Sequence, residues 1–334
     1  MAITLVSDRS SVLFQTHPLG HLLTKESEEG FVLNHTQGTV SLADIVSHGI
    51  DTNLENYIGL GTLNGFVGEL VIAGQGYLVD ATGQATPVDI DESTPFTMAI
   101  RFSPDIELTR AKLQGLTGKD LTGISHYLDT YHIADPEKYY ALKMVMETSV
   151  MHARSVRPPS RLHQPLRELE RKFDPAINQS YTLVGFRVPP HVDPRFNIPG
   201  YHFHAINNLL APNGRTDGGH VLDLTARRVH SIAIQQVGQV KVLHNGAVAI
   251  LLSMGLAAGF AAPAHAEEVQ PVHDYPTHHS SPHSHSHQAD HAKNAKKHHP
   301  LTGGLTHQAD QEANCWMAAE IPAIESSNSL FVVE

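Results

Sequence analysis

Residues 200–224 read GYHFHAINNLLAPNGRTDGGHVLDL, and this stretch decides the expected fold. Two runs of alternating apolar and polar residues flank a polar loop that contains Pro212, Asn213, Gly214 and Asp217. Turn-forming residues between two alternating runs are typical of adjacent antiparallel strands. The stretch therefore predicts an antiparallel pair formed by residues 200–206 and 219–224.

Three histidines occupy this predicted strand pair. His202 and His204 alternate with Phe203, so their side chains share one face of the first strand, about 7 Å apart. His220 opens the second strand after two glycines that allow a close turn. Three neutral imidazole nitrogens leave a fourth coordination position open, as a catalytic zinc site requires. The alternative interpretation is two exposed or hydrogen-bonded histidines, because an H-x-H pair also arises by chance in a histidine-rich chain.

Strands also predominate on either side of this pair. Apolar runs bounded by glycine or proline predict further strands at 58–64, 68–72, 76–84, 96–102, 181–188 and 228–236. Helices are expected only around 42–48, 119–131 and 166–173. The expected fold class is α/β of the strand-rich, α+β kind.

One predicted strand is unusually long and covers residues 140–156. Its period-two alternation places every second residue on one face of the strand. The residues expected to share that face are Leu142, Met144, Met146, Val150, His152 and Arg154. Core packing is the expected role of the two methionines.

Composition excludes several classes of protein. The formal net charge of the 334 residues is −11, so the chain gains nothing from counterion release on DNA or RNA, and no nucleic-acid partner is expected. A single cysteine, Cys315, cannot form an internal disulfide or a cysteine-rich zinc site. The first thirty residues lack the sustained apolar core of a secretory signal, which favours a cytoplasmic protein with no membrane partner.

The chain changes character after Gln239. Residues 247–262 form an apolar run that is short for a membrane span, and 265–307 are rich in histidine, serine and lysine. Such a polar tract buries too little apolar area to offset ordering entropy, so disorder is expected. The predicted organisation is an N-terminal part, 1–157; a metal-binding part, 158–240 with a tail at 316–334; and an insertion, 241–315.

Several motifs, taken in order, resemble the alpha-acetolactate decarboxylase family. They are Gly59-Leu-Gly-Thr-Leu-Asn-Gly-Phe-Val-Gly-Glu-Leu-Val, Arg154-Ser-Val, Leu183-Val-Gly-Phe-Arg-Val-Pro, Gly200-Tyr-His-Phe-His and Gly218-Gly-His-Val-Leu-Asp. The resemblance extends from about Leu13 to Gln239. The chain departs from the family pattern at Val67, at Arg157 and in the region after Gln239.

This resemblance implies a fold, a reaction and a cofactor. The implied architecture is an N-terminal mixed β-sheet part and a C-terminal β-barrel-like part that carries the zinc, assembled as a homodimer. The implied reaction is the decarboxylation of 2-acetolactate, a small-molecule substrate, to acetoin and CO2 through an enediolate. Zn2+ would act as the Lewis acid, held by His202, His204 and His220.

The resemblance also implies roles for four other residues. Arg154 matches the family's arginine and would hold the substrate carboxylate, because guanidinium is permanently charged and binds carboxylates through a planar fork. Glu69 matches the active-site glutamate that would protonate the enediolate. Thr62 matches a threonine that would contact substrate, and Glu325 is the match for a second, C-terminal glutamate.

Two other functions remain open from the sequence. A histidine-rich metal buffer or metallochaperone would account for the tract at 265–307, but not for the ordered series of motifs. A different metalloenzyme with three histidine ligands on a β scaffold, such as an oxygenase or a hydrolase, would account for the histidines alone.

Overall fold

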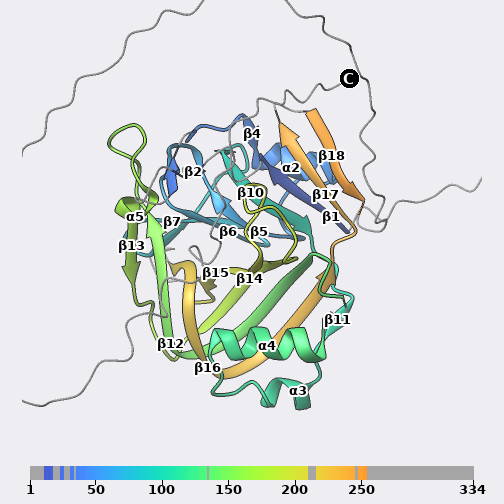
Figure 1. Cartoon of the computed structure of the whole chain (residues 1–334). Helices are drawn as coiled ribbons and strands as arrows, with labels where there is room; N and C mark the ends of the chain where they lie inside the picture. The colour runs from blue at the N-terminus through green and yellow to red at the C-terminus, as the bar shows by residue number, and fades with distance from the viewer. Residues whose placement is uncertain are drawn as a thin grey trace, which may run out of the picture. The chain divides into compact units, whose positions relative to one another are not determined.

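The computed structural model describes residues 11–17, 23–25, 31–33, 35–133, 135–209, 216–244 and 247–253, and strands predominate among them (Figure 1). The strands of the N-terminal half are β1 (Val12–Thr16), β2 (Leu23–Lys25), β3 (Phe31–Leu33), β4 (Val40–Ser41), β5 (Tyr57–Thr62), β6 (Glu69–Ala73), β7 (Gly76–Val79), β8 (Gln84–Pro87), β9 (Ser93–Thr94), β10 (Phe96–Arg101) and β11 (Ile106–Glu107). Those that follow are β12 (Tyr140–Val156), β13 (Glu170–Phe173), β14 (Ser180–Val188), β15 (Gly200–Asn207), β16 (Thr216–Gln236), β17 (Gln239–His244) and β18 (Ala247–Ser253). The helices are α2 (Leu42–His48), a 3-10 turn η3 (Asn64–Phe66), α3 (Arg110–Gln114), α4 (Leu121–Tyr131) and α5 (Leu166–Leu169).

Most of the described strands join one large mixed sheet. Fourteen strands pair in it, along the order β13-β12-β14-β15-β16-β8-β7-β6-β5-β10-β1-β17-β18, with β11 added on β16. β1 and β17 pair in parallel, whereas their neighbours pair antiparallel. The predicted strand-rich fold with few helices is confirmed.

The predicted hairpin is also confirmed. β15 and β16 pair antiparallel, with His204 opposite His220. The second strand is longer than expected, because the two strands predicted at 219–224 and 228–236 are one continuous β16. In addition, β12, β14, β15 and β16 pair in a closed cycle, since β16 returns to pair with β12.

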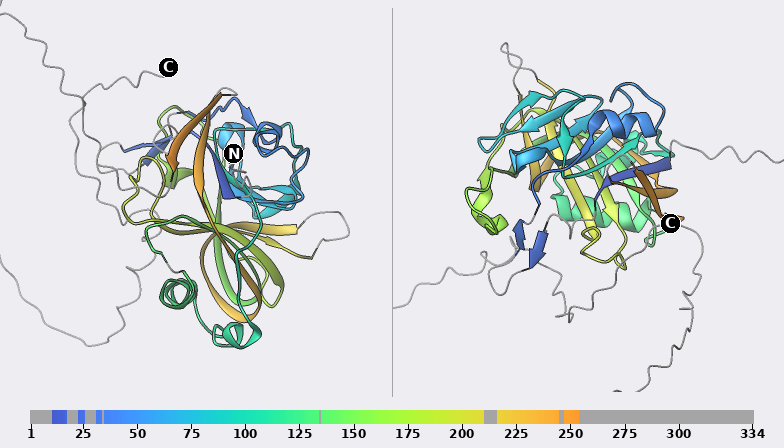
Figure 2. Two further views of the ribbon diagram at one scale, coloured as in Figure 1. Left: turned by 90° about the vertical axis from the view of Figure 1, so that its right-hand side faces the viewer. Right: turned by 90° about the horizontal axis from the view of Figure 1, so that it is seen from above.

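Two cores lie on opposite faces of these four strands. The first core packs Val184 and Phe186 with Leu60 and Val71, so β14 and β15 lie against β5 and β6 (Figure 1). The second core packs strand residues such as Met144, Leu183 and Phe203 with apolar side chains of α3 and α4, namely Leu113, Ile124 and Leu128. The two helices therefore cover the face opposite β5 and β6 (Figure 2).

β12 changes face part-way along its length, which corrects one prediction. Met146 and Met151 both pack into the second core although they are an odd number of residues apart. The cause is a β-bulge: Thr148 pairs with Ala226 and Val150 with Thr225, so Ser149 has no partner in the β16 register.

The prediction that Leu142 and Arg154 share one face is therefore wrong. Arg154 has the parity of Val156, which packs in the first core, whereas Leu142 packs in the second. Val150, which was expected beside Leu142, is 40% exposed, and His152 is exposed too. One inserted residue thus places Arg154 on the face that carries the histidines.

A second correction concerns residues 166–173. The predicted helix ends after one turn at Leu169, and Glu170–Phe173 form β13, which pairs antiparallel with the end of β12. The apolar residues Leu166, Leu169 and Phe173 have helical spacing, but pairing of Glu170–Phe173 with the long neighbouring strand overrides it.

The predictions for the C-terminal region lie largely outside the described residues. β18 takes the first part of the apolar run at 247–262, while the histidine tract and the tail at 316–334 are not described. The domain boundaries after residues 157 and 240 stay predictions. Among the described residues, no helix combines the length and apolar character needed to cross a membrane.

Substitution of Gly185 tests how closely β14 packs against β15, the strand that carries His202 and His204. It lies opposite Phe203 in β15, and an added Cβ would collide with the His202 carbonyl oxygen and the Phe203 ring. We expect Gly185→Ala to lower the free energy of unfolding by about 1–3 kcal/mol, as overpacking does, in urea denaturation. In the control Gly115→Ala, the backbone is helical and the nearest atom lies at 3.4 Å, so a change within about 0.5 kcal/mol is expected. Equal losses in the two variants would contradict this packing.

Candidate metal centre

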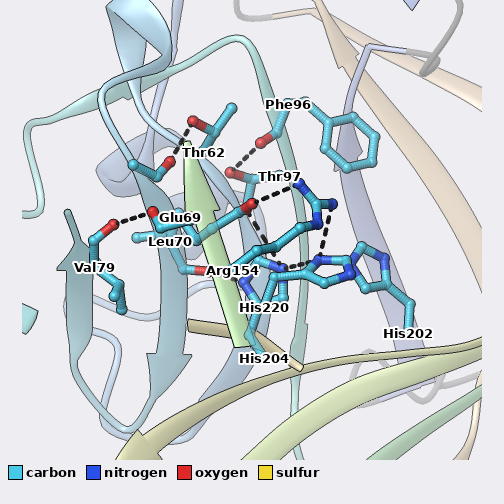
Figure 3. A network of polar contacts seen from close by, with 12 residues as sticks. Thr62, Glu69, Leu70, Val79, Phe96, Thr97, Arg154, His202, His204 and His220 are labelled. Atoms are coloured by element: carbon cyan, nitrogen blue, oxygen red, sulfur yellow. Dashed lines mark hydrogen bonds and ion pairs between the residues drawn. The ribbon is translucent and has the colours of Figure 1, made fainter. Parts of the chain in front are cut away.

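Three imidazole rings meet where β15 pairs with β16. His202 and His204 alternate with Phe203, which faces the second core, so both imidazoles lie on the opposite face. His220 Nδ1 lies 3.0 Å from His202 Nε2 and 3.3 Å from His204 Nε2 (Figure 3). One nitrogen from each ring falls within 4.8 Å of the others, so the three residues form a group that could hold a metal ion.

Burial keeps these imidazoles neutral. Desolvation lowers the pKa of His204 to about 3; a hydrogen bond to the Leu70 backbone opposes this fall, and the neighbouring Arg154 charge contributes to it. Desolvation also holds the pKa of His202 and of His220 well below the usual value, with Arg154 and the neighbouring histidines adding to the effect. Neutral rings retain the lone pairs that a metal ion needs.

The hydrogen-bond partners fix where those lone pairs point. His204 Nδ1 lies 2.8 Å from the Leu70 carbonyl oxygen, which can only accept, so Nδ1 carries the hydrogen and Nε2 the lone pair. Arg154 Nη2 lies 3.3 Å from His220 Nδ1 and can only donate, so this nitrogen also presents a lone pair. His204 Nε2 and His220 Nδ1, which lie 3.3 Å apart, are therefore both unprotonated, so no hydrogen bond joins them.

This arrangement fits a tetrahedral metal ion. Facing lone pairs repel unless a cation lies between them. Nitrogen ligands at 2.0–2.1 Å from one tetrahedral ion are about 3.3–3.4 Å apart. His204 and His220 have this spacing, whereas His202 and His220, at 3.0 Å, are slightly closer together. The carbonyl of Leu70 would then be the outer partner that fixes the His204 tautomer, as metal-bound histidines generally require.

A buried charge network adjoins the three rings. Arg154 lies directly opposite His220 in the β12–β16 register, and its side chain is only 2% exposed. Its Nη1 lies 3.4 Å from Glu69 Oε1 and 3.2 Å from Glu170 Oε1. Glu69 Oε2 in turn lies 3.6 Å from His204 Nε2. The predicted residues Glu69, Arg154, His202, His204 and His220 are therefore brought together, from β6, β12, β15 and β16.

The carboxyl group of Glu69 is strongly perturbed. Burial raises its pKa to about 7; the Arg154 charge opposes this rise, and the Glu170 charge adds to it. Near neutral pH, Glu69 therefore exists in both the protonated and the ionised form, which is the range in which a carboxyl group can exchange protons.

The structure describes Thr62, one of the other two predicted site residues, but not Glu325. Thr62 is buried and lies opposite Glu69 in the β5–β6 register, but its hydroxyl donates to the Gly68 carbonyl at 2.7 Å. The Thr62 hydroxyl is thus hydrogen-bonded to the backbone of the residue before Glu69. The contact of Thr62 with substrate stays a prediction. Glu325 lies outside the described residues, so its role stays a prediction as well.

Sequence reasoning missed Glu170 altogether. It lies in a charged segment that was expected to be helical, and its contact with Arg154 arises only because β13 pairs with β12. Only a prediction of that strand pairing could have placed Glu170 near the site.

The family model of alpha-acetolactate decarboxylase matches residues 29–247, which is more than half of the chain and includes the whole site described above. The chain belongs to the alpha-acetolactate decarboxylase family.

Two alpha-acetolactate decarboxylases show the extent of the match. The one from Brevibacillus brevis is 28% identical over 217 residues, 64% of this chain and 66% of the relative. The one from Bacillus subtilis (strain 168) is 29% identical over 170 residues, 49% of this chain and 61% of the relative. The chain therefore matches just under two thirds of the length of these relatives.

Solved structures of alpha-acetolactate decarboxylases share the fold. The crystal structure of the enzyme from Bacillus subtilis strain 168 has a TM-score of 0.57 at 22% identity, covering 70% of this chain and 89% of its own. A Staphylococcus aureus protein described as similar to alpha-acetolactate decarboxylase has a TM-score of 0.55 at 19% identity, covering 70% and 88%. At 22% and 19% sequence identity, these structures show that the fold is shared and nothing more.

If the three histidines hold one metal ion, replacement of His202 should remove the bound metal. His202→Ala removes one of three ligands, so we expect the tightly bound metal to fall from one ion per chain to a small fraction, measured by plasma emission spectrometry after a weak chelating resin has removed loosely held ions. In the control His152→Ala, the exposed ring pairs with Asp174 on the outside of the sheet, and metal content should stay at the wild-type level. Full metal content in His202→Ala would rule out the centre.

Proposed function

We propose that this chain catalyses the decarboxylation of 2-acetolactate to acetoin and CO2, with a zinc ion held by His202, His204 and His220. Membership of the alpha-acetolactate decarboxylase family supports the reaction. The observation that carries the proposal is the meeting of three neutral imidazoles with one buried guanidinium and one buried carboxyl group. This set would provide a metal site, an anion-binding group and a proton donor side by side.

Zinc suits the donor set. Three imidazole nitrogens and an open fourth position are the ligand pattern of catalytic zinc sites. When bound, zinc would supply Lewis-acid stabilisation of the negative charge that develops on the ketone and hydroxyl oxygens of the substrate.

Arg154 would bind and orient the substrate carboxylate. Its guanidinium keeps a full positive charge in a site where few water molecules can compete, because the side chain is 2% exposed. Its place opposite His220 would hold the carboxylate beside the metal ligands. The bond to the carboxylate carbon then breaks, CO2 leaves, and the electron pair stays on the hydroxyl-bearing carbon, delocalised onto the neighbouring ketone as an enediolate.

Glu69 would complete the reaction by protonating that carbon. A carboxyl group with a pKa of about 7 holds a proton for part of the time near neutrality and can release it to a carbanionic carbon. Its contact with His204 places it at the edge of the metal centre. Transfer of the proton gives acetoin, and Glu69 takes up a new proton from solvent. We retain Glu325 as a candidate second carboxyl group and Thr62 as a candidate substrate contact.

The proposal also includes a β-barrel-like part, a homodimeric assembly and a cytoplasmic location. The closed cycle of β14, β15 and β16 with β12, a strand that precedes the predicted boundary after residue 157, supports a β-barrel-like part that carries the histidines. It lies against the strands of the N-terminal sheet that carry Glu69. A homodimer in the cytoplasm is our proposal for the assembly and its location, on the family resemblance.

The reaction itself can be tested directly. Purified protein mixed with 2-acetolactate should release acetoin, measured colorimetrically, above the spontaneous rate. Removal of metal with a strong chelator should abolish this release, and one equivalent of Zn2+ should restore it. Restoration by iron with uptake of oxygen, and not by zinc, would instead favour an oxygenase. Several weakly bound ions without acetoin formation would favour a metal buffer.

Glu69→Gln separates proton transfer from metal binding. The amide has the same shape but cannot deliver the proton, so we expect turnover to fall by about 10²–10⁴-fold while metal content stays unchanged. Glu147→Gln, on the partly exposed pair with His230, is the matched control and should turn over like wild type. Near-wild-type turnover of Glu69→Gln would exclude it as the donor.

A further inference from the structure

Arg154 contacts a second carboxylate, that of Glu170, to which the reaction outlined above assigns no contact with substrate. Arg154 pairs with Lys172 across the β12–β13 ladder, and Glu170 lies two residues along on the same face. Such diagonal neighbours are within reach of long side chains. Glu170 Oε1 lies 3.2 Å from Arg154 Nη1, closer than the 3.4 Å of Glu69 Oε1.

The two carboxylates differ in their access to solvent. Both contact the same guanidinium nitrogen, Nη1, while Nη2 faces His220. The Glu170 side chain is 21% exposed, compared with 9% for Glu69. Glu170 is therefore the more solvent-exposed of the two carboxylate partners of Arg154.

Glu170 is also the partner that can be displaced. A buried guanidinium without a counter-charge is strongly unfavourable, so Arg154 needs a carboxylate when no substrate is bound. A substrate carboxylate that approaches the same guanidinium meets the negative charge of Glu170 within a few ångströms. Binding then requires Glu170 to give up part of its contact with Arg154.

We propose that Glu170 is a specificity-determining residue that competes with carboxylate ligands for the Arg154 guanidinium and so limits the affinity of the site for anions. This inference rests on the proposed function, because it takes Arg154 as the group that binds the substrate carboxylate. A purely structural tie between β12 and β13 is the contrasting role. The two roles predict opposite effects on anion binding when the charge of Glu170 is removed.

The test compares an anionic with a neutral ligand in holoenzyme. The anionic probe is 2,3-dihydroxy-2-methylbutanoate, which has the substrate's carboxylate and hydroxyl but no ketone to accept electrons, so it cannot lose CO2. The neutral probe is acetoin. Isothermal titration calorimetry gives Kd for both, and steady-state kinetics gives kcat and KM for 2-acetolactate. The variants are Glu170→Gln, Glu170→Asp as the conservative rescue, and Glu168→Gln as the control.

Glu168 is a matched control because it lies two residues away but pairs with Arg161 and not with Arg154. In Glu170→Gln we expect Kd for the anionic probe and KM for 2-acetolactate to fall about tenfold, as loss of one nearby like charge implies. A change in kcat is a separate effect, because the Glu170 charge also adds to the raised pKa of Glu69. Kd for acetoin should stay unchanged. Glu170→Asp should move both constants back toward wild type, and Glu168→Gln should match wild type.

Three results would overturn the inference alone, provided wild type still makes acetoin. These are an unchanged or weaker Kd for the anionic probe in Glu170→Gln, equal shifts for anionic and neutral probes, and the same shift in Glu168→Gln. A wild-type protein that neither binds the anionic probe nor forms acetoin would overturn the proposed function, and this inference with it.

Discussion

The site depends on one buried cation, the guanidinium of Arg154. It contacts His220 on β16, Glu69 on β6 and Glu170 on β13, and so joins three strands around its own strand, β12. A charge with so little exposure requires nearby carboxylates, and it disfavours protonation of every imidazole beside it. The same side chain thus helps keep the three histidines neutral, and in the proposed function it would also provide the positive charge that binds the substrate carboxylate. Loss of this cation would alter both properties together.

The position of that cation results from a local irregularity in a long strand. Without the unpaired Ser149, the alternation of β12 would carry Arg154 to the second core, beside the helices. With it, Arg154 faces β6 and the imidazoles (Figure 3). The first core, formed where β5 and β6 pack on β14 and β15, then brings Glu69 down onto the histidines. Regular strand pairing forms the sheet, and the bulge at Ser149 turns the Arg154 side chain toward the histidines.

Much of this could be predicted from sequence because it depends on local periodicity. The alternation of His202 and His204, the turn residues before His220 and the long run at 140–156 each have one dominant physical interpretation. Glu170 could not be found in that way, because its role depends on which strand pairs with the end of β12. The face of Arg154 was predicted incorrectly for a related reason: strict alternation cannot reveal a bulge whose position is set by the partner strand. The motifs of the alpha-acetolactate decarboxylase family identified Arg154 as a site residue even though its predicted face was wrong.

The central claim is that His202, His204 and His220 share one metal ion beside Arg154. Diffraction from crystals of zinc-loaded protein, recorded on both sides of the zinc absorption edge, tests it most directly. The account predicts a single strong anomalous peak about 2.0–2.1 Å from one nitrogen of each of the three rings. Rings that point apart, or a zinc peak elsewhere with none between them, would contradict it.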